Sequence, residues 1–504
     1  MATSDLNLET VRDALAEIPQ EQAQSGTDPP PLDRIYIVSG HERALNPETP
    51  LVVGDRGTGK SFWSAALSGD DTRKLIARQF RRLSLDDVTV GWGFATGSGG
   101  QAFPGRRVLT RLLKSGHDAE DIWRAVVLHQ LSEVSGRPAL GGKWSDRVEA
   151  VSEDPEMEED LLTTIDGELV QREQKALIVF DGLDRLAYGW PEIRKLLQGL
   201  LKVCLDFRTF RAIRLKLFMR PDMWEDRGVW AFPDASKLQH SAVKLEWRRA
   251  DLYGLIWHWL GNHGKSGQMF RQWCRTEYNL RFDDVNIEGS RIHSVPRRLR
   301  NDEEVQGEIL NSIASRYMGR DRRRGKTYTW VPLHLADGKG QVSPRSFMLA
   351  MRNAAAESRE RDTAEALHFD AIKRGVQEAS KIRRQELEED YPWIRDVLDA
   401  LPGMTVPCTE QDMKIRFRSE NVVENIRPPA PEEAAKDSEA EEKVHLPPHA
   451  LEDLTSGQSK EDGLIQALIE IGVINRLGDG RLNMPDLFRV AAGIGRRGGV
   501  RPVR

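Results

Sequence analysis

Residues 51–61 read LVVGDRGTGKS, and this stretch decides the fold of the chain. Its apolar start predicts a buried strand, its glycines predict a loop, and the residues from Ser61 onward predict a helix. The spacing fits G-x-x-x-x-G-K-[ST], in which N–H groups of the loop and the helix start surround phosphate oxygens. Because the motif lies between a strand and a helix, we interpret it as a phosphate-binding loop rather than an ordinary glycine-rich turn.

The residue types of this loop indicate separate tasks. The glycines let the backbone curl so that its N–H groups point inward. Lys60 reaches the β- and γ-phosphates, and the Ser61 hydroxyl ligates Mg²⁺. The loop therefore predicts a nucleoside triphosphate and Mg²⁺ as cofactors. The residues predicted to bind the nucleotide here are Gly54, Asp55, Arg56, Gly57, Thr58, Gly59, Lys60, Ser61 and Phe62.

A second apolar strand is predicted to end in carboxylates. Residues 175–185 read KALIVFDGLDR, and the apolar run before Asp181 is typical of a central strand in a parallel sheet. Such a sheet binds ligands at the carboxyl ends of its strands, so Asp181 is predicted as the second Mg²⁺ ligand. Asp184 would orient or deprotonate the attacking water. The alternatives are a helix N-cap for Asp181 and a surface turn for Asp184.

Further strands complete the predicted core. Residues 213–222, IRLKLFMRPD, predict a strand beside the preceding one, which would place Arg220 near the γ-phosphate; the alternative is a surface arginine at a turn. Residues 34–38 are either a peripheral strand or a segment against the adenine, and residues 243–247 are the last core strand. The alternation of strands and helices over residues 35–260 predicts a three-layered α/β domain with a parallel sheet.

Composition bounds the class of protein. A chain of 504 residues is too long for one core, so we expect two to four domains. No apolar run approaches the roughly 20 residues of a membrane-spanning helix, which predicts no membrane partner. No secretory signal is visible and the three cysteines are scattered singly, so we expect a reducing, cytoplasmic location. A net charge of −5 predicts no global attraction to nucleic acid.

The middle of the chain, residues 265–355, is predicted to be mostly helical. Residues 343–347, SPRSF, begin a helix with Ser343 as N-cap. Arg345 is unfavourable near the positive end of that helix, which suggests an anionic partner such as phosphate. Residues 294–298, SVPRR, form a second similar spot.

The end of the chain combines a helix, a hairpin and many arginines. A helix over residues 463–471 precedes a hairpin over residues 472–483 with a Gly-Asp-Gly turn, which suggests a winged helix. Seven arginines lie between residues 476 and 504. They would bind a phosphate backbone or an acidic protein face, unless the tail is merely solubilising. The proline-rich, acidic residues 427–448 predict a disordered insertion.

With these motifs in place, the chain resembles P-loop ATPases of the broad AAA+/STAND group, which includes signalling ATPases and relatives of origin-recognition proteins. Residues 180–184, FDGLD, are similar to the D-G-L-D block of NACHT-type ATPases. Residues 218–222, FMRPD, resemble the sensor-1 strand, and residues 343–345 resemble the sensor-2 position of the lid. NACHT proteins usually follow D-G-L-D with glutamate, whereas Arg185 stands here. The resemblance therefore implies slow turnover, or Asp184 as the base.

The resemblance implies a bacterial, ATP-dependent switch or motor. Mg·ATP would lie between the core and the lid, fixed by Lys60, Arg220 and Arg345, and the winged helix would report its state to a protein partner or within a homo-oligomer. An arginine of a neighbouring subunit, Arg297 or Arg298, would complete the site. By analogy, the system would be phage defence or another conflict system.

Two further readings stay open at this point. One is an origin-recognition-like ATPase that holds duplex DNA with its winged helix, and the other is a nucleotide-bound scaffold without hydrolysis. The choice of ATP over GTP also follows from the resemblance. The predicted domains are an N-terminal helix and linker (1–32), an ATPase core (33–262), a helical lid (263–360), and a C-terminal helical and winged-helix domain (361–504).

Overall fold

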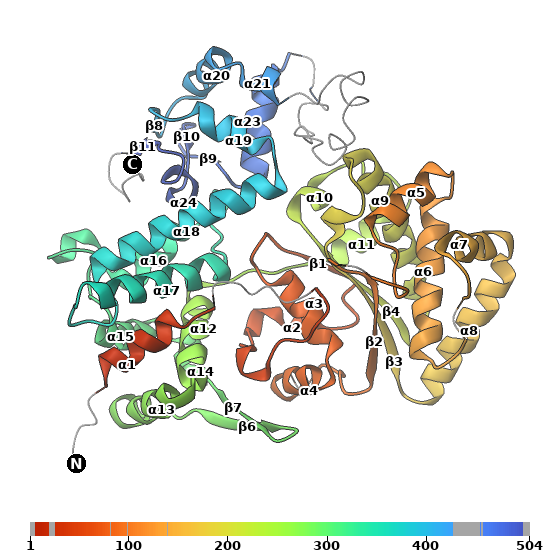
Figure 1. Ribbon diagram of the computed structural model, residues 1–504, viewed down its shortest axis with the longest axis horizontal. Helices are drawn as coiled ribbons and strands as arrows, with labels where there is room; N and C mark the ends of the chain where they lie inside the picture. Colours follow the sequence, from red (N-terminus) through yellow and green to blue (C-terminus); the bar gives the residue numbers. More distant parts are fainter. Residues whose placement is uncertain are drawn as a thin grey trace. The chain divides into compact units, whose positions relative to one another are not determined.

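The computed structural model describes residues 6–19, 26–80, 82–97, 99–138, 140–426, 454 and 457–496. The chain divides into two compact units, each described here by itself. The first unit comprises residues 22–246 and 287–290, and the second comprises residues 1–21, 247–286 and 291–504. Figure 1 labels their helices and strands.

A five-stranded parallel sheet forms the centre of the first unit, in the order β2-β3-β4-β1-β5. Leu217 on β4 lies opposite Leu51 on one side and Phe180 on the other, so β4 separates β1 from β3. All neighbouring strands run parallel, which confirms the α/β fold with a parallel sheet. The strands are β1 (Leu51–Val53), β2 (Val88–Phe94), β3 (Lys175–Phe180), β4 (Ile213–Met219) and β5 (Val243–Lys244).

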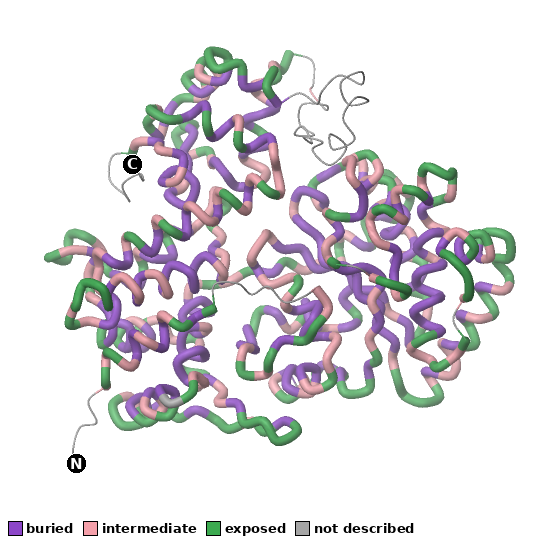
Figure 2. Tube along the Cα trace, in the orientation of Figure 1, coloured by how far each residue is buried: buried purple, intermediate pink, exposed green. Residues whose placement is uncertain are grey.

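Helices cover this sheet and bury its strands, as Figure 2 shows. The apolar run that identified β3 in the sequence is fully buried from Ala176 to Phe180. Trp123 of α6 packs edge-on against Phe180 and donates its indole N–H to the Leu196 carbonyl, which ties α6 to both β3 and α9. The α-helices of the unit are α2 (Glu42–Leu45), α3 (Lys60–Ser68), α4 (Asp70–Gln79), α5 (Arg106–Lys114), α6 (Ala119–Val134), α7 (Trp144–Glu153), α8 (Pro155–Gln171), α9 (Trp190–Asp206), α10 (Pro221–Glu225) and α11 (Ala235–Ser241).

Two edges of the predicted core differ from expectation. Residues 35–38 are buried but form no strand, and they follow a short 3-10 turn at Leu32–Arg34. The last core strand is present and pairs with β1, but it is only two residues long. Short outer segments of this kind are fixed by packing rather than by their own pattern, so sequence alone places them poorly.

The second unit is mainly helical. The N-terminal helix α1 packs on α17, and Trp259 of α12 donates its indole N–H to the Ala14 carbonyl at 2.7 Å. Helix α17 runs along α18, which forms the longest described helix of the unit. Its α-helices are α1 (Leu8–Ala16), α12 (Arg249–Asn262), α13 (Gly264–Tyr278), α14 (Arg297–Asn301), α15 (Glu303–Ile313), α16 (Thr327–Leu335), α17 (Pro344–Glu360), α18 (Phe369–Asp390), α19 (Ile394–Ala400), α20 (Glu410–Ser419), α21 (Val422–Asn425), α23 (Lys460–Glu470) and α24 (Asp486–Arg489).

Three small strand pairs accompany these helices. Strands β6 (Asp283–Ile287) and β7 (Ser290–Ser294) form a hairpin inside the stretch predicted to be mostly helical. Its turn at Glu288 and Gly289 has positive φ at both positions, the geometry of a tight two-residue hairpin. The predicted hairpin near residue 478 is present as β9 (Asn475–Arg476) and β10 (Leu482–Asn483). Strands β8 (Thr405–Val406) and β11 (Gly495–Arg496) pair in parallel.

The remaining expectations concern the acidic insertion, the three cysteines and membrane-spanning helices. The acidic insertion predicted for residues 427–448 lies outside the described residues. Cys204, Cys274 and Cys408 are buried free thiols. In the described part of the chain, no helix combines the length and the apolar character needed to cross a bilayer.

Candidate functional site

The loop between β1 and α3 has the curled backbone that its glycines predicted. Gly57 and Gly59 have φ angles of +79° and +103°, a region that L side chains rarely adopt. At Gly54 a Cβ would lie 2.6 Å from the Thr58 hydroxyl oxygen, so a side chain there would displace the loop. The Thr58 hydroxyl in turn donates to the Asp55 carbonyl at 2.8 Å and holds the curl closed.

Lys60, the first residue of α3, folds back over this loop. Its ammonium donates to the carbonyls of Gly54 at 2.7 Å and Asp55 at 3.0 Å. Desolvation lowers the pKa of Lys60, while the negative charges of Asp181 and Asp184 act in the opposite direction. The lysine charge therefore faces both predicted carboxylates as well as the loop.

Asp181 lies at the carboxyl end of β3 and is 1% exposed. Its backbone N–H donates to the Phe94 carbonyl at 2.9 Å, and its carboxylate accepts hydrogen bonds from Ser61 and, at 3.3 Å, from Ser64. Burial raises the pKa of Asp181, and these hydrogen bonds and the Lys60 charge only partly oppose the effect. Sequence reasoning missed Ser64; its signal was a small polar residue three positions after Ser61, on the same helix face.

Asp184 follows Asp181 through a turn at Gly182, whose φ is +67°. The end of β4 brings Arg220 to this turn: its Nη1 lies 3.3 Å from Asp184 Oδ2, and its Nε lies 3.2 Å from Asp222 Oδ1. Burial alone would raise the pKa of Asp184, but the charges of Arg220, Lys60 and Arg185 outweigh it, so the pKa of Asp184 is lowered. Asp222, which fixes the arginine, was not singled out from the sequence.

The predicted site residues of the first unit thus gather at the carboxyl edge of β1, β3 and β4. Beside the loop, Phe62 is half-buried and packs edge-on against Trp63, with ring centroids 5.3 Å apart. The donor set is a serine hydroxyl and a buried carboxylate, the oxygen ligands that Mg²⁺ prefers. The raised pKa of Asp181 shows the cost of keeping its charge there, a cost that a bound cation would reduce.

Three predicted arginines belong to the second unit. Arg345 stands in the first turn of α17, where Ser343 caps the helix, and its guanidinium pairs with Glu386 of α18 at 2.8 Å. A carboxylate of the same unit therefore balances the charge of Arg345 in this structure. Arg297 and Arg298 are exposed on α14, and Arg298 Nε lies 3.6 Å from Asp302. The roles suggested for these three residues stay predictions.

Comparisons with known proteins complete this account. No protein-family model matches the sequence, and no curated protein matches it either. Among solved structures, the ORC2 protein of Aeropyrum pernix, determined as ADPNP–ADP complexes, is similar at 12% sequence identity over 93% of each chain, with a TM-score of 0.31. The functional assignment therefore rests on the loop and its facing carboxylates rather than on this likeness.

Proposed function

We propose that the protein binds Mg·ATP at the loop of residues 54–61 and hydrolyses it. One observation carries the proposal: Ser61 and Ser64, one helical turn apart on α3, both donate to the buried Asp181 carboxylate. A phosphate-binding loop and the carboxylate of a separate strand therefore meet at one place. This is the arrangement that a metal-bound triphosphate requires.

Each residue has a distinct task in this proposal. The loop N–H groups and the amino end of α3 bind the phosphate oxygens, and the Lys60 ammonium binds the β- and γ-phosphates. The Ser61 hydroxyl and the Asp181 carboxylate would hold Mg²⁺, directly or through water. When bound, the metal neutralises charge that develops on the phosphate oxygens.

Asp184 is proposed to orient the attacking water. Its lowered pKa makes the Asp184 carboxylate a weaker proton acceptor, so it is better suited to accept a hydrogen bond from water than to remove a proton. Arg220, held by Asp222, places positive charge beside this carboxylate and is proposed to contact the γ-phosphate. With a weak base in this position and Arg185 in place of glutamate, the proposal expects slow turnover.

Replacing Asp181 with asparagine tests the assignment directly. The Asp181→Asn side chain keeps the size and one acceptor oxygen but loses the charge that Mg²⁺ requires. We expect ATP-hydrolysis rates to fall about 100-fold or more, and ATP affinity to lose its dependence on Mg²⁺. Phosphate release and ATP titration, each with Mg²⁺ and with EDTA, measure both effects. Unchanged Mg²⁺-dependent hydrolysis in this variant would contradict the role of Asp181 as a Mg²⁺ ligand.

Asp184→Asn separates catalysis from binding. Because Asp184 is proposed to act on water, its loss should lower kcat about 100-fold while ATP affinity changes little. Single-turnover phosphate release and equilibrium ATP binding report the two quantities. Asp222→Asn is the variant for comparison. It should loosen Arg220 and therefore weaken ATP binding in addition to lowering kcat. Equal losses of affinity in both variants would contradict a role for Asp184 on water.

The proposal includes the wider role that the resemblance implies, a nucleotide-dependent switch or motor with protein partners or further copies of itself, in a phage-defence or other conflict system.

The DNA-binding alternative gains no support from the described arginines of the C-terminal segment. These arginines pair with carboxylates of their own unit, and the remaining three, 497, 501 and 504, lie outside the described residues. The pairs are Arg476 with Glu410, Arg481 with Asp479, Arg489 with Asp486, and Arg496 with Asp486.

A further inference from the structure

A cavity of about 630 Å³ lies along the free edge of β2, within the first unit. This volume is within the range of small-molecule sites. Among the strands that the structure describes, β2 pairs with β3 alone, so its other edge carries no strand there. There the backbone N–H of Trp92 donates to Gln130 Oε1 at 2.9 Å, and Gln130 Nε2 donates to the Ala102 carbonyl at 2.7 Å. These two bonds fix the strand, α6 and the loop after β2 as one preformed wall.

The cavity combines apolar walls with polar side chains. Phe103 and Val134 supply apolar surface, and Trp92 is half-buried. Glu133 is solvent-exposed at the rim and Thr96 is half-buried. Within the described part of the chain, the Glu133 carboxylate makes no ion pair, and the Trp92 indole N–H and the Thr96 hydroxyl make no hydrogen bond. Apolar walls with a few free polar groups are typical of a ligand site.

The charge of the lining selects the class of ligand. Among the described residues that line the cavity, Glu133 is the one charged side chain. The negative charge of Glu133 acts on Arg147, but the contacts of Arg147 are with other residues. Its Nη1 donates to the Gln101 carbonyl at 3.3 Å, and its guanidinium lies over the Trp144 ring. A carboxylate and a tryptophan in one lining favour a cation and disfavour phosphate groups.

We propose that this cavity binds a small organic cation, a primary amine or a guanidine, through an ion pair with Glu133 and stacking on Trp92. The site is separate from the nucleotide loop, and binding there does not depend on ATP. It is nevertheless close to the turn after Asp181, because a Cβ on Gly182 would lie 3.4 Å from the Thr96 backbone nitrogen. An occupant that shifts Thr96 would therefore press on the turn that positions Asp181 and Asp184.

Calorimetric titration of the nucleotide-free, full-length protein tests the proposal. The probes are agmatine and putrescine as cations, with glutarate as an anion of similar size. We expect the cations to bind and glutarate not to bind. Glu133→Gln should weaken cation binding about tenfold or more, since the ion pair is lost. Glu149→Gln, an exposed glutamate on α7 that does not line the cavity, is the matched control and should bind as the native protein does.

Trp92→Phe adds an independent readout, because it keeps an aromatic ring but removes the indole N–H and weakens the cation contact. We expect an intermediate loss of affinity with an unchanged melting temperature. Absence of cation binding at millimolar concentration would overturn the proposal. Equal binding of glutarate, or equal affinities of Glu133→Gln and Glu149→Gln, would overturn it as well.

Discussion

Lys60→Ala is expected to abolish ATP binding and hydrolysis at ordinary ATP concentrations. The lysine supplies the mobile positive charge of the loop, and its ammonium, now bonded to the Gly54 and Asp55 carbonyls, is free to turn to phosphate oxygens. Charge-assisted bonds of this kind contribute about 3 kcal/mol, so the affinity should fall at least 100-fold by that estimate. Titration with ATP and phosphate-release assays measure the loss.

The fold should survive this substitution. Lys60 is the first residue of α3, and alanine is the best helix former, so the helix itself is not weakened. Circular dichroism and the melting temperature should match those of the native protein. Lys114→Ala, on the exposed end of α5, controls for the loss of one positive charge and should bind ATP normally. A Lys60→Ala protein with native ATP affinity would refute the nucleotide site.

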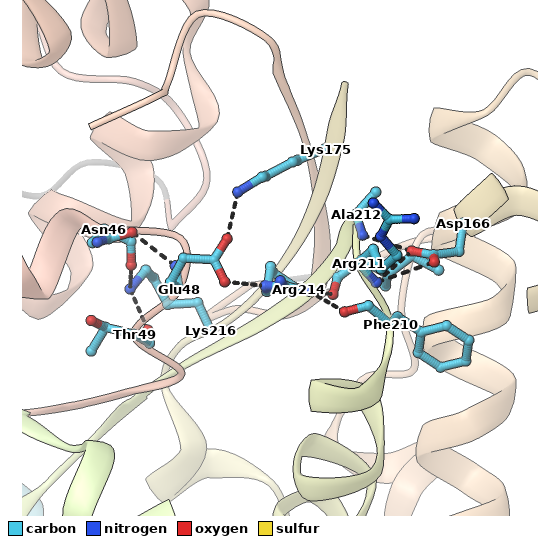
Figure 3. Close-up of polar contacts among 11 residues, drawn as sticks. Asn46, Glu48, Thr49, Asp166, Lys175, Phe210, Arg211, Ala212, Arg214 and Lys216 are labelled. Atoms are coloured by element: carbon cyan, nitrogen blue, oxygen red, sulfur yellow. Dashed lines mark hydrogen bonds and ion pairs between the residues drawn. The ribbon is translucent and has the colours of Figure 1, made fainter. Parts of the chain in front are cut away.

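Lys216→Met should cause the largest loss of stability among single lysine substitutions in the first unit. Lys216 lies within β4 and is completely buried. Its ammonium donates to the carbonyls of Ala44 at 2.9 Å, Asn46 at 2.9 Å and Thr49 at 2.6 Å. Figure 3 labels Asn46 and Thr49 beside Lys216. Methionine fills the space but leaves the buried carbonyls of Ala44 and Thr49 without this donor, which should cost about 3–5 kcal/mol. The Asn46 carbonyl keeps a second hydrogen bond, from the Thr49 N–H at 2.9 Å. Urea unfolding followed by circular dichroism measures the change.

Lys175→Met is the matched control for this experiment. Lys175, at the start of β3, is partly exposed and forms an ion pair with Glu48, which also contacts Arg214 (Figure 3). A partly exposed ion pair of this kind contributes less than about 1 kcal/mol. Similar losses of stability in the two variants would show that the Ala44 and Thr49 carbonyls do not depend on Lys216.

The stability of the native protein should also depend on pH through Lys216. Burial lowers the pKa of Lys216 from its ordinary value of 10.5 to about 7. Above pH 7 the folded amine loses its proton while the unfolded chain still holds one, so the free energy of unfolding rises with pH by up to about 1.4 kcal/mol per unit. Between about pH 7 and 8.5, below the ordinary pKa of cysteine, this slope should be smaller in Lys216→Met. Identical slopes would contradict the shifted pKa.

The features that could be predicted from the sequence are those encoded by short, continuous sequence patterns. The loop at residues 54–61 and the strand ending at Asp181 are continuous stretches, and the structure brings them together as a parallel sheet requires. The partner of Arg345 could not be predicted in the same way. The sequence indicated only that its charge at a helix start needs an anion; the packing of α17 along α18 decides that the anion is Glu386. Lys216 was also missed, because one lysine in an apolar strand gives no sign of which carbonyls it meets.

The order of the strands in the sheet has a consequence for synthesis of the chain. Strand β4 lies between β1 and β3, yet it follows both in the sequence. While the ribosome is still adding residues before Ile213, β1 and β3 each present a side that only β4 can pair. Unpaired strand edges associate readily with other chains, so the nascent protein is prone to aggregation during this interval of translation. The carboxyl edge of β1, β3 and β4, where the predicted site residues gather, is therefore completed only after β4 has been made.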